Sequence, residues 1–261
     1  LSKTGMSCYP LSVLMQAGLR DILVITTPND APAFENLLGD GERWGINIEY
    51  AQQPSPDGLA QALIIAEDFL DGAPSALILG DNLFFGQAFG DVVAQAAKCE
   101  AGATVFGYRV SNPSAYGVVS FDETGKVLDL IEKPVDPPSN YAVTGLYFYD
   151  EHAPSLAKTI KPSARGELEI TTLNQLYLQQ DKLRVETLSD GTTWLDTGTH
   201  RSLLQAAQFV SVIEERQGIR ICCPEVVAYK KGWIDADQLD ALSRPLIKSG
   251  YGNYLSKVAK A

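Results

Sequence analysis

Apolar and polar positions follow two different periods along the first two thirds of the chain. Short continuous apolar runs are typical of strands buried in a sheet, whereas apolar residues at i, i+3, i+4 and i+7 indicate one face of a helix. The runs predict strands at 20–27, 46–51, 76–79 and 102–110, and the helical spacing predicts helices at 30–41, 59–70 and 89–100. This alternation predicts an α/β fold with a doubly wound, mostly parallel sheet and helices on both faces.

The pattern changes after residue 115. A hairpin is predicted at 116–134, a strand at 141–150, and shorter strands at 183–188 and 192–198. Helices are predicted at 169–181, from about 199 to 217, at 235–243 and at 252–261. We expect one α/β domain over residues 1–218 and a small helical C-terminal appendage over 219–261.

Composition narrows the function classes. The 261 residues are 45% hydrophobic, with four cysteines, two histidines and a formal net charge of −11. No apolar run approaches the roughly 20 residues of a membrane span, and the first ten residues lack the apolar core of a secretory signal. The cysteines show no CxxC spacing, which argues against a zinc site and against a disulfide framework. We therefore expect the chain to belong to a reducing compartment, the cytoplasm. The negative charge argues against a nucleic-acid surface, and any phosphorylated substrate would need a local cation, a metal or helix N-termini to offset the repulsion.

Two carboxylates stand at the ends of short apolar strands. In ALILGDNLFFG (76–86) the apolar run stops at Asp81 and Asn82, and in TTWLDTGTH (192–200) it stops at Asp196. A turn would explain the first pattern and helix capping the second, although a threonine after Asp196 could cap that helix equally well. Ligands in α/β proteins bind at the carboxyl ends of strands, and Mg²⁺ prefers one or two carboxylates plus substrate phosphates. The alternative hypothesis is therefore a Mg²⁺ site formed by Asp81 and Asp196.

The segment AQQPSPDGLAQAL (51–63) joins a predicted strand to a predicted helix. The Gln53 amide offers a donor and an acceptor, which suits the edge of a nucleobase, and Gly58 permits close approach to the backbone. The structural alternative is a stiff surface loop.

The segment LIEKP (130–134) places Glu132 next to Lys133 at the end of an apolar strand. Neighbouring residues in a strand face opposite sides, so we expect that Glu132 and Lys133 do more than form an ion pair with each other. A solvated sheet edge is one interpretation. In the other, Glu132 accepts sugar hydroxyls and Lys133 binds a phosphate. In SARGELEIT (163–171), capping explains part of the charge around Arg165, and lining of an active site stays open.

No GxGxxG after a strand, Walker A sequence or GxSxG is present, so dehydrogenase, P-loop and serine-hydrolase hypotheses fail. Taken together, the stretches described above resemble the sugar-1-phosphate nucleotidylyltransferases. The matching stretches run in order from about Tyr9 to the C-terminus: YPLSVLMQAGLRDILVITTP, QPSPDGLAQAL, LILGDN, ATVFGYRV, YGVVSFD, EKP, SNYAVTGLYFYD, KPSARGELEIT, WLDTGTH and IEERQG.

The resemblance implies a Rossmann-like nucleotidyltransferase fold, a Mg²⁺ cofactor and a homotetramer. It implies attack by the phosphate oxygen of glucose 1-phosphate on the α-phosphorus of dTTP, which gives dTDP-glucose for dTDP-rhamnose synthesis and releases pyrophosphate. By the same resemblance, Asp81 and Asp196 hold Mg²⁺, Gln53 and Gly58 contact the thymine base, and Lys133 lies near the sugar phosphate. The residues implied to line the sugar side are Asn82, Tyr116, Gly117, Glu132, Val143 and Gly145.

The N-terminus departs from the family pattern. Members of the family begin with a strand, a loop resembling GGxGTRL and a lysine-bearing segment, none of which appears in LSKTGMSCYP. Lys3 lies nearby but does not match the context of the family lysine. Because that loop would hold the triphosphate, we expect little or no turnover from the chain as written. The alternative function is a non-catalytic nucleotide-sugar-binding or regulatory homologue. A metal-dependent glycosyltransferase fits less well, because residues 81–83 are Asp-Asn-Leu and not Asp-x-Asp.

Overall fold

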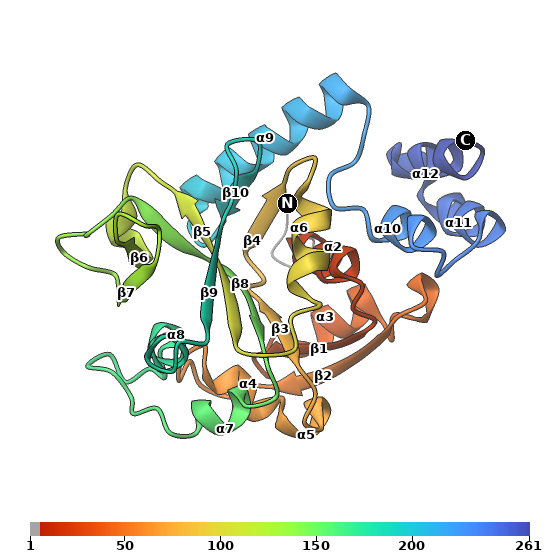
Figure 1. Cartoon of the computed structure of the whole chain (residues 1–261). Coiled ribbons are helices and arrows are strands. Elements are labelled where there is room, and N and C mark those ends of the chain that lie inside the picture. The colour runs from red at the N-terminus through yellow and green to blue at the C-terminus, as the bar shows by residue number, and fades with distance from the viewer. Residues whose placement is uncertain (1–5) are drawn as a thin grey trace.

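The computed structural model describes residues 6–261, so Lys3 and the rest of residues 1–5 lie outside the described residues. Figure 1 shows the arrangement of the elements. The helices are α2 (Cys8–Ala17), α3 (Ala31–Leu38), η1 (Glu42–Trp44), α4 (Gln61–Ile65), α5 (Glu67–Leu70), α6 (Phe89–Ala96), η2 (Pro113–Ala115), α7 (Ala153–Ala157), α8 (Ile170–Gln179), α9 (His200–Gln217), α10 (Pro224–Lys230), α11 (Ala236–Ser243), η3 (Arg244–Ser249) and α12 (Tyr251–Ala259). The strands are β1 (Asp21–Thr26), β2 (Asn47–Gln52), β3 (Ser75–Ile78), β4 (Asn82–Phe85), β5 (Ala103–Arg109), β6 (Gly117–Phe121), β7 (Val127–Glu132), β8 (Tyr141–Tyr149), β9 (Leu183–Thr187) and β10 (Thr193–Asp196).

Strand β8 is the centre of the largest sheet. Strand β5 pairs with β8 along one edge, while β6 pairs with the beginning of β8 and β3 with its end. The order across the sheet is β7-β6-β8-β5-β9, with β3 also on β8. Two parallel pairings, β1 with β2 and β5 with β9, occur among seven in residues 6–261. The largest sheet is therefore mixed and not mostly parallel, because β8 runs antiparallel to β3, β5 and β6.

Alternating side chains on β5 and β8 form the cores on the two faces of this sheet. On one face Val105, Tyr147 and Tyr149 pack with α4, α7 and α8. On the other face Phe106 and Phe148 pack with α2 and α6. Because successive strand residues point to opposite faces, this register buries both sets. The predicted α/β class, a central sheet with helices on both faces, is confirmed.

Helices α10, α11 and α12 share a third core with α2, β1 and β2. Aromatic residues are enriched at subunit interfaces, and this C-terminal region carries several of them. In the structure Trp233, Tyr251 and Tyr254 are half-buried against this internal core. Their packing within the chain accounts for them without a partner.

Several local elements differ from the expected pattern. The helix predicted over 59–70 is divided at Ala66, whose ψ of −2° interrupts the helical backbone. Helices α2, α7 and α10 and strand β4 were not predicted, and β4 forms because its residues pair antiparallel with β10. Among residues 6–261 no helix has both the length and the apolar character needed to cross a bilayer.

Candidate active site

A pocket of about 270 Å³ lies where β3 ends and β4 begins. Its walls come from β4, β6, β8, β10 and the end of β7, which are far apart in the sequence. Nine of the predicted site residues line it: Asp81, Asn82, Tyr116, Gly117, Glu132, Lys133, Val143, Gly145 and Asp196. The fold therefore gathers most of the predicted residues in one place.

The two strand-end carboxylates face the same glycine. Pairing of β4 with β10 sets Asn82 opposite Asp196, and Thr197 fixes the turn by donating to the carbonyl of Asp81 from both its N–H (2.9 Å) and its hydroxyl (2.7 Å). A Cβ on Gly198 would lie 3.1 Å from Asp196 Oδ1 and 3.2 Å from Asp81 Oδ2. Burial, with Asp81 as a further cause, raises the pKa of Asp196, although the Gly198 N–H partly opposes this by donating to its carboxylate.

Helix capping does not account for Asp196. Thr199 caps α9, because its hydroxyl accepts from the Ser202 N–H at 3.1 Å. Asp196 accepts instead from the Gly198 N–H at 2.8 Å and lines the pocket. The carboxylate is therefore available for chemistry beyond capping, as the threonines after it suggested.

Asn82 holds Asp81 from behind. The Asn82 side chain donates to Asp81 Oδ1 at 2.8 Å, and its own oxygen accepts from Trp194 Nε1 at 2.5 Å and from the Gly145 N–H at 3.1 Å. Only 2% of Asn82 is exposed, and a Cβ at Gly145 would lie 2.8 Å from the Asn82 oxygen. Asn82 and Gly145 thus line the pocket while orienting the first carboxylate.

Glu132 and Lys133 point into the same pocket, so the expectation that they face opposite sides is wrong. Strand β7 ends at Glu132, and Lys133 adopts a left-handed backbone with a φ of 43°. This turn, closed by the Lys133 N–H donating to the Tyr116 carbonyl at 3.0 Å, brings Lys133 Nζ to 3.8 Å from Glu132 Oε1. Thr171 donates to the other oxygen of Glu132 at 2.5 Å. Alternation holds only inside a strand.

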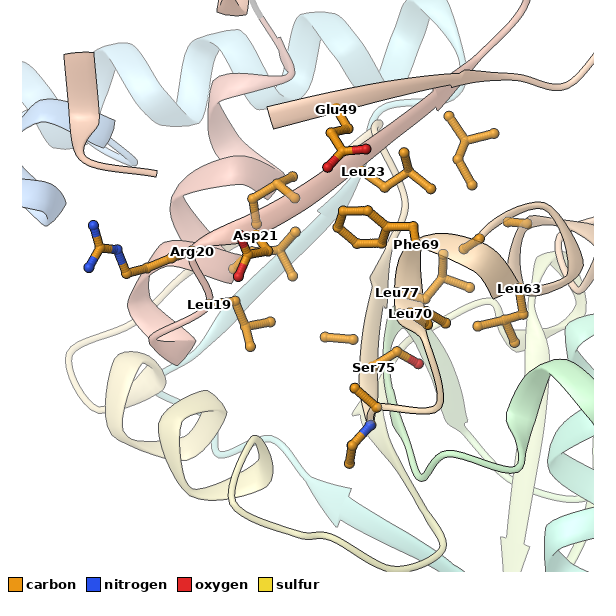
Figure 2. A pocket seen from close by; sticks show the side chains of 18 of the residues that line it. Leu19, Arg20, Asp21, Leu23, Glu49, Leu63, Phe69, Leu70, Ser75 and Leu77 are labelled. Carbon is orange, nitrogen blue, oxygen red and sulfur yellow. The ribbon is translucent and has the colours of Figure 1, made fainter. Parts of the chain in front are cut away.

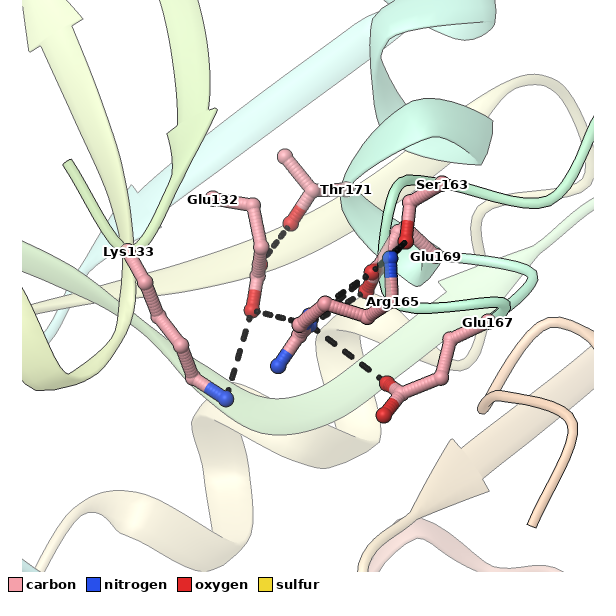
Figure 3. Close-up of polar contacts among 7 residues, drawn as sticks. All are labelled: Glu132, Lys133, Ser163, Arg165, Glu167, Glu169 and Thr171. Atoms are coloured by element: carbon pink, nitrogen blue, oxygen red, sulfur yellow. Dashed lines mark hydrogen bonds and ion pairs between the residues drawn. The ribbon is translucent and has the colours of Figure 1, made fainter.

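Figure 3 shows Arg165 at the centre of a group of carboxylates. Its Nη2 lies 2.9 Å from Glu169 Oε2, 3.4 Å from Glu167 Oε2 and 3.5 Å from Glu132 Oε1. Hydrogen bonding to Glu169 is the main cause of the raised pKa of Arg165. The sequence left Arg165 open between capping and active-site lining, and the structure places it in the pocket wall with Glu167 and Glu169.

Gln53 and Gly58 lie beside the pocket and do not line it. Gln53 Nε2 donates to Gln61 Oε1 at 2.6 Å and to the Gly58 carbonyl at 3.2 Å. Gly58 has a φ of +106°, and a Cβ there would collide with the backbone of Leu168. Leu59 of the same loop does line the pocket, so the segment adjoins it.

The charges of the pocket suit a divalent cation. Its wall carries five carboxylates and only two cationic side chains, Lys133 and Arg165. The facing pair Asp81 and Asp196 offers the oxygen donors that Mg²⁺ prefers, and space remains for substrate phosphates. The residues present therefore fit the metal that the sequence suggested.

Comparisons with known proteins give a consistent result. The model of a family described as nucleotidyl transferase matches residues 1–212. A glucose-1-phosphate thymidylyltransferase from Xanthomonas campestris pv. campestris is 58% identical over 97% of this chain and 85% of its own length. One from Mycobacterium tuberculosis is 56% identical over 95% of this chain and 85% of its own length.

Solved structures agree with these matches. A candidate glucose-1-phosphate thymidylyltransferase from Bacillus anthracis, in complex with sucrose, is 37% identical with a TM-score of 0.72, over 78% of this chain and 81% of that one. A UDP-glucose pyrophosphorylase in complex with UDP-glucose is 23% identical with a TM-score of 0.67, over 78% of this chain and 85% of that one. The latter likeness shows the fold alone.

Proposed function

Because this chain belongs to the nucleotidyl transferase family, we propose that it transfers a thymidylyl group from dTTP to glucose 1-phosphate. The products are dTDP-glucose and pyrophosphate. The observation that carries the proposal is the convergence in one pocket of Asp81 and Asp196 with the cations Lys133 and Arg165. The names of the relatives supply the nucleotide and the sugar, and they favour an enzyme over a non-catalytic binding homologue.

The reaction is a single displacement. An oxygen of the sugar phosphate forms a bond to the α-phosphorus of dTTP. The bond between that phosphorus and the oxygen bridging the α- and β-phosphates breaks, and pyrophosphate leaves with the electron pair. No side chain needs to form a covalent intermediate, so positioning and charge neutralisation carry the catalysis. Lys133 and Arg165 hold the sugar phosphate, and each leaves a carboxylate partner to do so.

Asp81 and Asp196 hold Mg²⁺ in this proposal. The ion, when bound, neutralises phosphate charge and stabilises the leaving oxygens. The protein's part is orientation, since Asn82 fixes Asp81 and the Gly198 N–H fixes Asp196.

The remaining assignments follow the resemblance. Gln53 and Gly58 contact the thymine base. Within residues 6–261 the Gln53 side chain uses only its Nε2 group in hydrogen bonds, so its carbonyl oxygen can accept from the base. The sugar is lined by Asn82, Tyr116, Gly117, Glu132, Val143 and Gly145. The close fit of Gly117 supports this arrangement, since a Cβ there would lie 3.3 Å from Glu132 Oε2.

Calorimetry and pyrophosphate release together test the proposal. The chain should bind dTDP-glucose more tightly with Mg²⁺ than without it, and any pyrophosphate release should require dTTP, glucose 1-phosphate and Mg²⁺ together. Asp81→Asn and Asp196→Asn should remove the Mg²⁺ dependence of dTDP-glucose binding, and they should lower whatever turnover the chain shows by about 10²–10³. Gln53→Ala should weaken the binding of dTTP by about 1–3 kcal/mol, because a buried hydrogen bond to the base is lost.

The exposed Asp237 of α11 provides the control, since Asp237→Asn changes the same charge away from the pocket. Mg²⁺-dependent binding that survives in both carboxylate variants would overturn the metal assignment. Equal affinity for dTDP-glucose and UDP-glucose would overturn the choice of thymine.

We also propose that the chain acts in the cytoplasm, on the route to dTDP-rhamnose, as a homotetramer. The resemblance is the support for all three. Light scattering at micromolar concentration checks the assembly, and a monomer there would contradict it.

A further inference from the structure

A closed turn over residues 163–167 carries Arg165 into the candidate active site, and we call this segment the Arg165 turn. The Gly166 N–H donates to the Ser163 carbonyl at 2.8 Å, and the Ser163 N–H donates to the Glu167 carbonyl at 2.9 Å. Arg165 stands at the tip of the turn with 42% of its side chain exposed. A long side chain so exposed samples many rotamers unless other groups hold it.

The Ser163 hydroxyl makes two hydrogen bonds that bear on Arg165. It accepts from the Arg165 backbone N–H at 3.2 Å, and it donates to Glu169 Oε1 at 2.7 Å. A serine hydroxyl has one proton to donate and lone pairs that accept, so the two bonds form together. One hydroxyl therefore fixes both the backbone of Arg165 and the carboxylate that faces its guanidinium group.

Glu169 holds one edge of the Arg165 guanidinium. Its Oε1 accepts from Nε at 3.2 Å and from Nη2 at 2.9 Å, and its Oε2 lies 2.9 Å from Nη2. Glu169 is the N-cap residue of α8, yet its side chain makes no capping hydrogen bond. Capping therefore does not explain this carboxylate. Paired bonds of this kind are strong and directional, so the orientation of Glu169 sets that of Arg165.

This pairing leaves the other end of the guanidinium toward the pocket. Within residues 6–261, Arg165 Nη1 makes no hydrogen bond with the protein. Figure 3 shows Lys133 on the side of Arg165 that faces away from Glu169. Glu132 Oε1 lies 3.5 Å from Arg165 Nη2 and 3.8 Å from Lys133 Nζ. A phosphate that displaces Glu132 can therefore meet both cations while Arg165 stays on Glu169.

The arginine of a larger cavity lacks such support. That cavity, of about 750 Å³, lies between β1 and β3, and Figure 2 shows its leucines and Phe69 with Arg20 at one end. Arg20 Nε donates to the Gly45 carbonyl at 2.8 Å, and within residues 6–261 no carboxylate forms an ion pair with Arg20. The attachment of Arg165 is therefore specific to its turn and does not follow from an arginine lining a cavity.

We propose that Ser163 is a positioning residue for phosphate binding, because its hydroxyl orients Glu169 and the Arg165 backbone so that the guanidinium faces the sugar phosphate. The proposal rests on the proposed function, which assigns that phosphate to Lys133 and Arg165. Ser163 does not line the pocket, so it acts only through Arg165. Removal of the hydroxyl leaves the charge of Arg165 in place and takes away its direction.

Calorimetry with glucose 1-phosphate and Mg²⁺ tests the proposal, because it requires no turnover. Ser163→Ala should weaken binding about tenfold, the equivalent of one hydrogen bond to a charged group, whereas Ser163→Thr keeps a hydroxyl and should stay within about twofold. In an Arg165→Ala background, Ser163→Ala should have no further effect, since a positioning residue acts only through the group that it positions. Ser155→Ala is the matched control, because it removes an exposed hydroxyl, bonded to the His152 carbonyl, away from the pocket.

A second measurement needs no ligand. The bond from the Arg165 Nε–H to Glu169 slows the exchange of that proton with water, and its NMR signal reports how persistently the pair is formed. Ser163→Ala should speed this exchange about threefold or more, whereas Ser163→Thr should not. Thermal unfolding of each variant shows that it remains folded.

The outcomes separate this proposal from the proposed function. A parent chain that does not bind glucose 1-phosphate, or an Arg165→Ala variant that binds it as tightly as the parent, would overturn the proposed function and this inference with it. If Arg165→Ala weakens binding and Ser163→Ala does not, the proposed function stands and the role of Ser163 is refuted. An equal loss from Ser163→Ala with and without Arg165, or unchanged exchange at Nε, would also refute it.

Discussion

Asn82 offers the sharpest test of how the candidate active site is held together. Asn82→Ala removes the oxygen that accepts from Trp194 Nε1 and from the Gly145 N–H, both in buried surroundings. Each donor left without a partner costs about 1–3 kcal/mol. Two such donors with some relaxation should lower the free energy of unfolding by about 3 kcal/mol, a fall in Tm of roughly 6–12 °C for a chain of this size.

A second variant separates stability from orientation. Asn82→Asp keeps an acceptor for both donors but replaces the N–H that holds Asp81 with an oxygen, now facing the Asp81 carboxylate. Two carboxylates so placed raise one another's pKa in the folded state. An acid whose folded pKa is raised loses stability as pH rises, so Asn82→Asp should be more destabilised at pH 8 than at pH 4.

Thermal unfolding at both pH values is the assay, with the exposed Asn253→Ala as control. A loss below about 0.5 kcal/mol in Asn82→Ala would refute the role of these hydrogen bonds, since ordinary surface substitutions fall in that range. A pH-independent Asn82→Asp would refute the contact with Asp81.

Two further predictions concern packing and cysteine chemistry. Gly58→Ala should lower the free energy of unfolding by about 2 kcal/mol more than Gly72→Ala, because both positions have positive φ but only Gly58 abuts a backbone segment, that of Leu168. Comparison of the two unfolding curves decides it, and equal losses would refute the steric argument. Burial raises the pKa of Cys8 to about 11 and of Cys223 to about 12. At pH 8, Cys8 should therefore react with iodoacetamide about a hundredfold, and Cys223 about a thousandfold, more slowly in the native than in the unfolded protein, because only the thiolate reacts. Mass spectrometry would show the rates, and equal rates in the native and unfolded protein would contradict this.

The sequence predicted best where one local pattern sufficed. The apolar runs located β1, β3 and β5, and the stretch 116–134 located the β6–β7 hairpin, because strand periodicity is a local property. Strand direction was less accessible. The antiparallel course of β8 between β3 and β5 depends on long-range pairing that no short segment encodes.

The site shows the same division. Asp81 and Asp196 stood out because a carboxylate ends each apolar run, and the register of β4 with β10 then sets Asp196 opposite Asn82, the residue after Asp81. Lys133 was misjudged because a left-handed backbone at a non-glycine residue follows from no periodicity. The role of Arg165 could not be assigned from the sequence, because it depends on ion pairs with three carboxylates, one of which lies on β7.

These carboxylates bear on how the pocket selects its substrates. Lys133 and Arg165 are each paired with glutamates, so a ligand phosphate must compete with a protein carboxylate for either cation. A neutral sugar offers no such exchange and gains little from these residues, while a phosphate without a metal meets five carboxylates. Since opposite charges attract and like charges repel more strongly in partly desolvated surroundings, we expect the pocket to bind either of them only weakly. Under the function proposed above, a sugar phosphate bound together with Mg²⁺ would satisfy the cations and the acidic pair at once, and an acidic protein could then bind two phosphorylated substrates.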